Sequence, residues 1–236
     1  MDAKFKLSEL DYPASAEGSL SIGNRVFKVL REAIVQLQFR PGHLLSEAEM
    51  AKQIGVSRQP VREAFIKLAE IGLVEIRPQR GTLVTLISAK EMENARFLRE
   101  IIEVAIVRKL ALVVTDGDIA VLREMTGELD RVGQSGDVTS ILRTDEDFHV
   151  KIAELADCAY AWRILENLKT NIDRVRYLTL GEAGIVENVV SQHHAIVDAL
   201  ATRSPDLSEA AMRTHMADII YALPSMVTAH PELFVD

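Results

Sequence analysis

The sequence predicts a mainly α-helical protein with a small β-hairpin in its N-terminal third. Two segments with apolar residues at helical spacing occupy residues 46–72, and two short strand-like runs, 73–77 and 82–86, follow them. Helical spacing then continues almost without interruption to the C-terminus. With 236 residues, 48% of them hydrophobic, the chain is long enough to build two domains with substantial cores.

The first two of these helices are bounded by residues typical of helix ends. Ser46 and Glu49 have the Ser-x-x-Glu spacing of a capping box, so a helix is expected to begin at Ser46. Gly55 accepts the left-handed conformation that ends many helices, and we expect it to end this one. Ser57 is suited to cap a second helix, which Gly72 ends. Two short helices joined by a tight turn are therefore predicted.

The second helix has an apolar face and a polar face. Its apolar residues share the side that we expect to pack inward: Val61, Ala64, Phe65 and Leu68. Ser57, Arg58, Gln59 and Arg62 point elsewhere. Arg58 and Arg62 lie about one turn apart, and with Gln59 they offer groups suited to phosphates and to the edges of guanine or adenine.

The two strand-like runs predict a hairpin behind this helix. They are joined by Pro78, Gln79, Arg80 and Gly81, a connection rich in turn residues that exposes one arginine. Helix, turn, helix and hairpin together predict a winged helix-turn-helix, a structure that enters a DNA groove.

Charge distribution favours DNA binding by this part of the chain. Residues 19–88 hold ten basic and six acidic side chains, a balance of +4 in a chain whose formal charge is −8. Residues 89–236 hold 15 basic and 25 acidic side chains, which would repel nucleic acid. The alternative is a plain helical bundle, because capped helix pairs occur in many bundles and an arginine pair is commonly a solvated face.

Residues beyond the hairpin predict an all-α antiparallel bundle of about six helices, because the connections between them are short. The expected helices span residues 90–113, 117–133, 137–156, 159–181, 184–202 and 206–229. The expected domain organisation is a flexible tail (1–18), a winged helix-turn-helix (19–87) and the helical domain (90–230).

Four side chains of the helical domain have the character of metal ligands: Asp145, His149, His193 and His215. Asp145 and His149 lie one turn apart and so share a helix face, and the two later histidines could face the same interior. Three imidazoles and a carboxylate suit zinc or another first-row divalent ion. The alternative is a set of unconnected histidines on helix surfaces.

Nothing in the sequence suggests membrane insertion or secretion. No apolar run approaches membrane-spanning length, the N-terminus lacks the apolar centre of a secretory signal, and a single cysteine excludes an intramolecular disulfide framework. We therefore expect a cytoplasmic protein.

These motifs closely resemble those of GntR-type transcription regulators of the FadR-like subfamily, which carry an FCD effector-binding domain. The resemblance covers nearly the whole chain. It rests on FRPG, on LSEAEMAKQIGVSRQPVREAFIKLAEIGLVEIRPQRGTLV and, in the second half, on Asp-x-x-x-His, a His before AIVDAL, and Met-x-x-His.

The resemblance implies DNA contacts at the start of the second helix and at the hairpin tip, by Ser57, Arg58, Gln59, Arg62, Arg80 and Gly81. The hairpin tip of such regulators reaches the minor groove. Some members also use an arginine where this sequence has Ala48, so that contact is expected to be absent.

The resemblance also implies a divalent metal ion, zinc in the first place with nickel or manganese as alternatives, bound by Asp145, His149, His193 and His215. Gln192 departs from the family, in which many members have Glu just before the ligand histidine. Arg99 matches a position that helps some members hold an anionic effector. Its alternative reading is a solvent-exposed helix arginine paired with Glu103.

The function implied is a metabolite-responsive transcription regulator, a repressor, that binds a pseudo-palindromic operator as a homodimer. A small carboxylate or sugar acid would bind near the metal and shift the population of domain arrangements. The alternative from another class is a metal-dependent hydrolase with an appended helix-turn-helix, but DEDFH is not HExxH and offers no convincing general base. A helical interaction module without a ligand is a third reading.

Overall fold

The computed structural model describes residues 21–180 and 184–235, so the tail predicted for residues 1–18 lies outside the described residues. The chain divides into two compact units. The first runs to Ile87 and includes Glu232–Val235, and the second comprises Ser88–Pro231. The prediction of a mainly α protein with a small sheet is confirmed.

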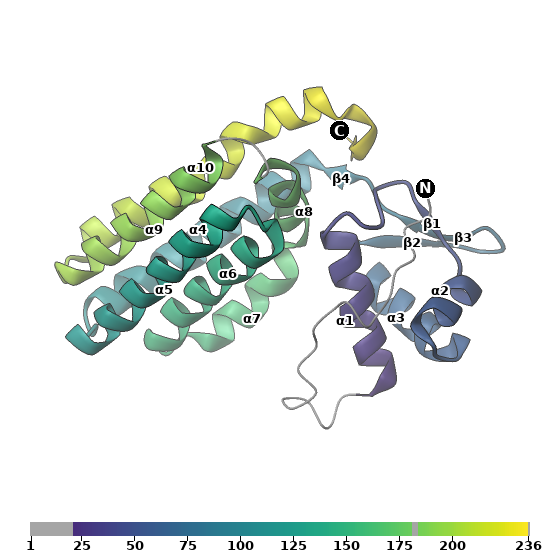
Figure 1. Cartoon of the computed structure of the whole chain (residues 1–236), viewed down its shortest axis with the longest axis horizontal. Coiled ribbons are helices and arrows are strands. Elements are labelled where there is room, and N and C mark those ends of the chain that lie inside the picture. The colour runs from purple at the N-terminus through teal and green to yellow at the C-terminus, as the bar shows by residue number, and fades with distance from the viewer. Residues whose placement is uncertain (1–20, 181–183, 236) are drawn as a thin grey trace. The chain divides into compact units, whose positions relative to one another are not determined.

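The first unit is a winged helix-turn-helix (Figure 1). Its elements are α1 (Ile22–Val35), β1 (Leu44–Leu45), α2 (Glu47–Ile54), α3 (Arg58–Glu70), β2 (Val74–Arg77) and β3 (Gly81–Val84). Strand β3 lies between β1 and β2 in an antiparallel sheet. A second small sheet pairs β4 (Ile87–Ser88) with β5 (Phe234–Val235), which follows the short 3-10 helix η2 (Pro231–Leu233).

The core of the first unit forms where α1 packs on α3. Both helices carry apolar residues three or four positions apart, which places them on one face of each helix. The buried members of this contact are Val26, Leu30, Ala33, Ile34, Val61, Ala64, Phe65 and Leu68. The predicted inward face of α3 is thus the observed one, and α3 is anchored from behind while its opposite side stays in solvent.

The predicted helix boundaries are close to the observed ones, but the capping hydrogen bonds are not made. Ser46 and Ser57 occupy the N-cap positions of α2 and α3, yet neither side chain makes a capping hydrogen bond. Glu49 accepts a hydrogen bond from Gln53 Nε2 at 2.9 Å instead of closing a capping box. Gly55 adopts the predicted left-handed conformation, with φ 76°.

The hairpin between β2 and β3 requires glycine at one position. Arg77 lies opposite Gly81 at the end of the ladder. Gly81 has a φ of 103°, and a Cβ on it would come within 3.1 Å of the Leu45 carbonyl oxygen. A side chain there would meet both backbone strain and a steric clash. Gly81 therefore lets the wing fold back closely over β1.

The second unit is a helical bundle. Its helices are α4 (Ala89–Ala111), α5 (Asp116–Ser135), α6 (Val138–Leu155), α7 (Ala159–Leu168), α8 (Thr170–Thr179), α9 (Ile185–Ala201) and α10 (Pro205–Ala229). Helix α10 packs on α4 and α9, and α5 packs on α6 and α9, so the long helices run side by side in Figure 1. Among the described residues, no helix has the length and apolar character needed to cross a membrane.

One predicted helix of this bundle is divided in two. The segment predicted as 159–181 is interrupted at Lys169, which ends α7 and precedes α8, and residue 181 lies outside the described residues. Lys169 has a ψ of 0°, away from the usual helical value near about −42°. Its buried ammonium group donates to Asp173 at 2.6 Å and to Glu146 at 3.1 Å. Glu146 belongs to another helix and Asp173 follows the interruption, and no Gly or Pro lies at it. The local sequence pattern therefore did not predict that the helix is interrupted at Lys169.

Candidate functional site

The start of α3 presents polar side chains to solvent. Ser57, Arg58 and Gln59 are all exposed, while the opposite side of the helix is buried against α1. Free backbone N–H groups at a helix N-terminus also favour an anion such as a phosphate. This end of α3 therefore has the charge and the exposure needed to enter the major groove of DNA.

Arg62 lies one turn further along α3 and is held by Glu47 of α2. Its Nε and one terminal nitrogen donate to the two carboxylate oxygens of Glu47, each at 3.0 Å. The Arg62 side chain is 59% exposed, so solvent screens this ion pair and it adds little to stability. Its main effect is to restrict where the Arg62 guanidinium group can lie.

The wing exposes the predicted arginine. Arg80 is exposed in the loop between β2 and β3, directly before Gly81. The preceding Gln79 adopts a left-handed conformation with φ 60°, which closes the tight connection.

Four side chains of ligand type converge inside the second unit. Asp145 and His149 lie one turn apart on α6, His193 comes from α9, and His215 comes from α10. One ligand atom from each lies within 4.8 Å of the other three. The Nε2 atoms of His149 and His215 are 3.2 Å apart, and His193 Nε2 is 3.3 Å from Asp145 Oδ1.

The chemistry of this cluster fits a divalent metal ion. His193 Nε2 is buried and has no hydrogen-bond partner among the described residues, whereas Asp145 Oδ1 lies 2.7 Å from a terminal nitrogen of Arg176. A buried polar atom left unsatisfied costs roughly 1–3 kcal/mol. A metal ion coordinated by His193 Nε2 would remove that cost, and three imidazoles with one carboxylate are a common ligand set for first-row ions.

The other ring nitrogen of each histidine faces an acceptor. His193 Nδ1 lies 2.8 Å from the Val189 carbonyl oxygen, and His215 Nδ1 lies 2.9 Å from Gln192 Oε1. His149 Nδ1 lies 2.5 Å from a carboxylate oxygen of Glu103. These acceptors assign the proton of each neutral ring to Nδ1 and leave the Nε2 lone pairs directed at the cluster.

The ionisation states suit metal binding at neutral pH. Burial lowers the pKa of His193 to about 4 and holds the pKa of His215 well below its ordinary value. Burial alone would raise the pKa of Asp145, but the charge and hydrogen bond of Arg176, together with the neighbouring His193 and His149, outweigh burial and hold that pKa well below the ordinary range. A charged Asp145 with neutral His193 and His215 is the state that a metal ion requires of these ligands.

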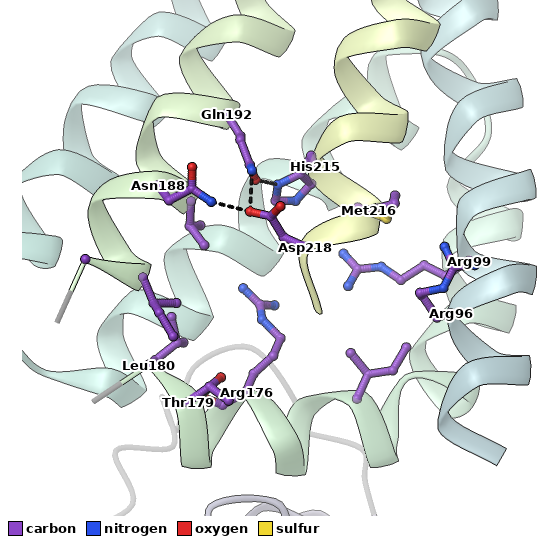
Figure 2. Close-up of a pocket in the computed structure, with 14 residues that line it drawn as sticks. Arg96, Arg99, Arg176, Thr179, Leu180, Asn188, Gln192, His215, Met216 and Asp218 are labelled. Atoms are coloured by element: carbon purple, nitrogen blue, oxygen red, sulfur yellow. Dashed lines mark hydrogen bonds between the residues drawn. The ribbon is translucent and has the colours of Figure 1, made fainter. Parts of the chain in front are cut away.

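A cavity of about 500 Å³ adjoins the cluster, with His215 in its wall. Three arginines line it, Arg96 and Arg99 from α4 and Arg176 from α8, together with Asn188, Gln192 and Asp218 (Figure 2). The volume is within the range of small-molecule sites. The mixture of cationic, amide and apolar lining suits a small anion with a carbon skeleton.

Arg99 combines parts of its two predicted readings. Its side chain is paired with Glu103, as one reading held, but it is buried rather than solvent-exposed, and that part of the reading is wrong. Its position in the cavity wall agrees with contact to an anion.

Sequence reasoning missed several residues of this site: Arg96, Glu103 as a partner of His149, Arg176, Asn188 and Asp218. Arg96 precedes Arg99 by three residues, so helical spacing could have placed both on one face. The others come from different helices, and no local pattern connects them to the ligands.

Comparison with known proteins identifies the class. Residues 22–84 match the model of the gntR family of bacterial regulatory proteins, and residues 95–218 match the FCD domain. The chain belongs to the GntR family of transcription regulators that carry an FCD domain, as the sequence motifs had suggested.

Relatives with names agree with this class. The HTH-type transcriptional repressor RspR of Escherichia coli K12 is 38% identical over 84% of this chain and 87% of its own length. The probable D-xylose utilization operon transcriptional repressor of Paenarthrobacter nicotinovorans is 30% identical over 92% of each chain.

Solved structures show the same fold. Escherichia coli McbR/YncC superposes with a TM-score of 0.76 at 19% identity, covering 88% of this chain and 99% of that one. A GntR regulator from Rhodococcus sp. RHA1 superposes with a TM-score of 0.72 at 27% identity, covering 87% and 99%. The protein is a DNA-binding transcription regulator and not an enzyme, so the hydrolase alternative is set aside.

Proposed function

We propose that this regulator is a metabolite-responsive repressor whose FCD domain binds a divalent metal ion and a small anionic effector. The observation that carries the proposal is the convergence of Asp145, His149, His193 and His215 beside a cavity lined by three arginines. Residues 19–87 act as the DNA-binding domain and residues 90–230 as the sensor. Two relatives named as repressors support that direction of control.

Zinc is the ion that we assign first. Imidazole nitrogens suit zinc and nickel, whereas carboxylate oxygens also suit manganese. Nickel and manganese are therefore the alternatives to zinc. A site with four protein ligands that accepts a fifth donor can take an oxygen of the effector. A small carboxylate or sugar acid would then contact both the ion and the arginines, and binding would shift the population of conformations that fit the operator.

A homodimer would read the operator. Two copies of α3 would occupy successive major grooves of a pseudo-palindromic site, with Ser57, Arg58, Gln59 and Arg62 at the grooves and the wing tip, Arg80 and Gly81, in the flanking minor groove. For the dimer interface we propose the exposed apolar side chains of α4 and α7, two helices that pack on each other, and we call them the apolar patch. Its members are 42% to 68% exposed: Phe97, Leu98, Ile101, Tyr160 and Ile164.

Replacing Arg58 by Ala is expected to weaken operator binding by at least ~1 kcal/mol, because a bidentate arginine–guanine contact discriminates by roughly that amount or more. The operator is first selected from a pool of random duplexes with the unaltered protein, and affinity is then measured by fluorescence anisotropy at fixed salt. Arg123→Ala is the matched control, since Arg123 is a 60% exposed arginine of the sensor unit. Equal affinities for Arg58→Ala and the unaltered protein would remove Arg58 from the reading surface.

Native mass spectrometry of the full-length protein, purified without added metal or chelator, is expected to show a dimer with one metal ion per chain. Ile164→Glu places a charge in the apolar patch and is expected to give a monomer that keeps its metal. Val121→Glu is the matched control, because Val121 is 43% exposed on α5, outside the patch. A bare monomer from the unaltered protein would contradict both the dimer and the metal site, and a dimeric Ile164→Glu would move the interface elsewhere.

A further inference from the structure

Asp218 of α10 stands out in the cavity wall because it is a carboxylate among arginines. It is fixed by two amide groups of α9, since Asn188 and Gln192 both donate to its Oδ2 atom. Figure 2 shows both hydrogen bonds, with Asp218 facing the space into which Arg176 also extends. The other oxygen, Oδ1, accepts no hydrogen bond from the residues that the structure describes. A half-buried carboxylate is thus held in place with one oxygen available to a ligand.

Gln192 ties this carboxylate to the metal cluster. Its Oε1 atom faces His215 Nδ1 at 2.9 Å, and its amide nitrogen donates to Asp218. The two contacts fix the amide orientation, because only the oxygen can accept the histidine proton and only the nitrogen can donate to a carboxylate. Glutamate at this position would place a second negative charge against Asp218. Glutamine at this position instead adds no charge and donates a hydrogen bond to Asp218.

The charges around the cavity limit the charge of its ligand. Each arginine of the wall already faces a carboxylate: Arg96 faces Glu100, Arg99 faces Glu103, and Arg176 faces Asp145. Among the described residues that line the cavity, the charge of Asp218 has no cationic partner. The three arginines, their three carboxylate partners and Asp218 together carry one negative charge. A divalent ion at the cluster would change this sum to one positive charge. A ligand with one negative charge completes the balance, whereas a dianion would bring its second charge towards Asp218.

We propose, on the basis of the function proposed above, that Asp218 selects the effector: a monoanion whose carbon chain carries hydroxyl groups. The carboxylate of the effector lies at the arginine and metal side of the cavity, and a hydroxyl group donates to Asp218 Oδ1. Asp218 rejects dicarboxylates by charge repulsion. Asp218 also rejects simple fatty acids, because these would bury its carboxylate without donating a hydrogen bond to it. Sites built to bond a hydroxyl group discriminate strongly against ligands that lack one.

Calorimetry on the zinc-loaded full-length protein tests the proposal with three six-carbon acids: gluconate, hexanoate and adipate. These share a terminal carboxylate and differ in hydroxyl groups and in a second carboxylate. We expect gluconate to bind at least tenfold more tightly than the other two. In Asp218→Asn, which keeps the size of the side chain, we expect the preference for gluconate over adipate to fall at least tenfold.

Two controls separate the possible causes. Asp198→Asn removes a charge from a 74% exposed position of α9 and should leave all three affinities unchanged. Zinc content is measured on every variant, so that an effect of Asp218→Asn through Gln192 and His215 is recognised as loss of metal. Arg96→Gln should weaken all three acids together, because it acts at the carboxylate side.

The outcomes distinguish this proposal from the one on which it rests. Adipate or hexanoate binding as tightly as gluconate, or an unchanged preference in Asp218→Asn, would overturn the role of Asp218 while the anion site stands. Failure of all three acids to bind would contradict the ligand class. The proposed effector site itself would be contradicted if the protein held no metal and Arg96→Gln bound the acids with the same affinities as the unaltered protein.

Discussion

Replacing His193 by Ala is expected to abolish stoichiometric metal binding while operator affinity without effector largely survives. His193 Nε2 is a buried, unsatisfied atom 3.3 Å from Asp145 Oδ1, and we therefore propose it as a direct ligand. Loss of a mere hydrogen-bond partner of a ligand commonly lowers metal affinity about 10–100-fold, and loss of a ligand should exceed that. Metal content by mass spectrometry after dialysis is the measurement.

Chelation gives a second readout of the same prediction. Binding to the folded state alone stabilises by about 2.7 kcal/mol when the free ligand is at 100 times its dissociation constant. For a chain of this size that corresponds to roughly 5–10 °C in Tm. EDTA should therefore lower the Tm of the unaltered protein and leave that of His193→Ala unchanged.

His194→Ala is the matched control for this experiment. His194 is the next residue on α9, but its side chain is 44% exposed and pairs with Asp130 at 2.8 Å, away from the cluster. It should keep full metal content and the response to EDTA. A His193→Ala protein that retains one tightly bound ion per chain would refute the ligand set.

The local sequence pattern predicted more of the winged helix-turn-helix unit than of the helical unit. In the first unit the apolar face of α3 and the left-handed Gly55 follow from helical spacing and backbone sterics, which act over a few residues. Strand β1 escaped prediction because two residues, Leu44 and Leu45, form it only by pairing with β3. Its existence depends on the partner and not on its own sequence.

The site in the sensor shows the same limit more clearly. Helical spacing paired Asp145 with His149 and residue type suggested His193 and His215 as further ligands, but only the family resemblance implied that all four form one site. Residues such as Asp218 carry no local mark, since an aspartate on a helix is commonly a solvated charge. Their roles arise from the packing of α4, α8, α9 and α10 around one cavity, which is a tertiary property.

Glu103 links the two halves of this site. One carboxylate oxygen contacts Nδ1 of the ligand His149 at 2.5 Å, and the other accepts a hydrogen bond from Arg99 in the cavity wall. Burial alone would raise the pKa of Glu103, but the charge of Arg99 and the contact with His149 outweigh burial and lower that pKa to about 2. The residue is therefore a buried anion that contacts both the proposed metal ligand His149 and Arg99 in the cavity wall.

Replacing Glu103 by Gln is expected to lower zinc affinity about 10–100-fold, because the imidazole of His149 loses the negative charge that orients it and raises its basicity. Glu103→Ala should in addition lower the free energy of unfolding by about 3–5 kcal/mol, since it leaves Arg99 buried without its carboxylate. Competition for zinc against a chromophoric chelator measures the first effect, and urea unfolding of the metal-free protein measures the second.

Glu100→Gln separates the role of Glu103 from a general loss of negative charge on α4. Glu100 pairs with Arg96 and Arg213 and is 19% exposed, and it has no contact with a metal ligand among the described residues. It should retain the zinc affinity of the unaltered protein even though it releases an arginine of the same cavity. Equal losses in the two glutamine variants would mean that Glu103 acts through the overall field and not through His149. If only Glu103→Gln loses zinc affinity, the carboxylate of Glu103 connects Arg99 to His149. An anion that binds Arg99 would then alter the metal site through this carboxylate.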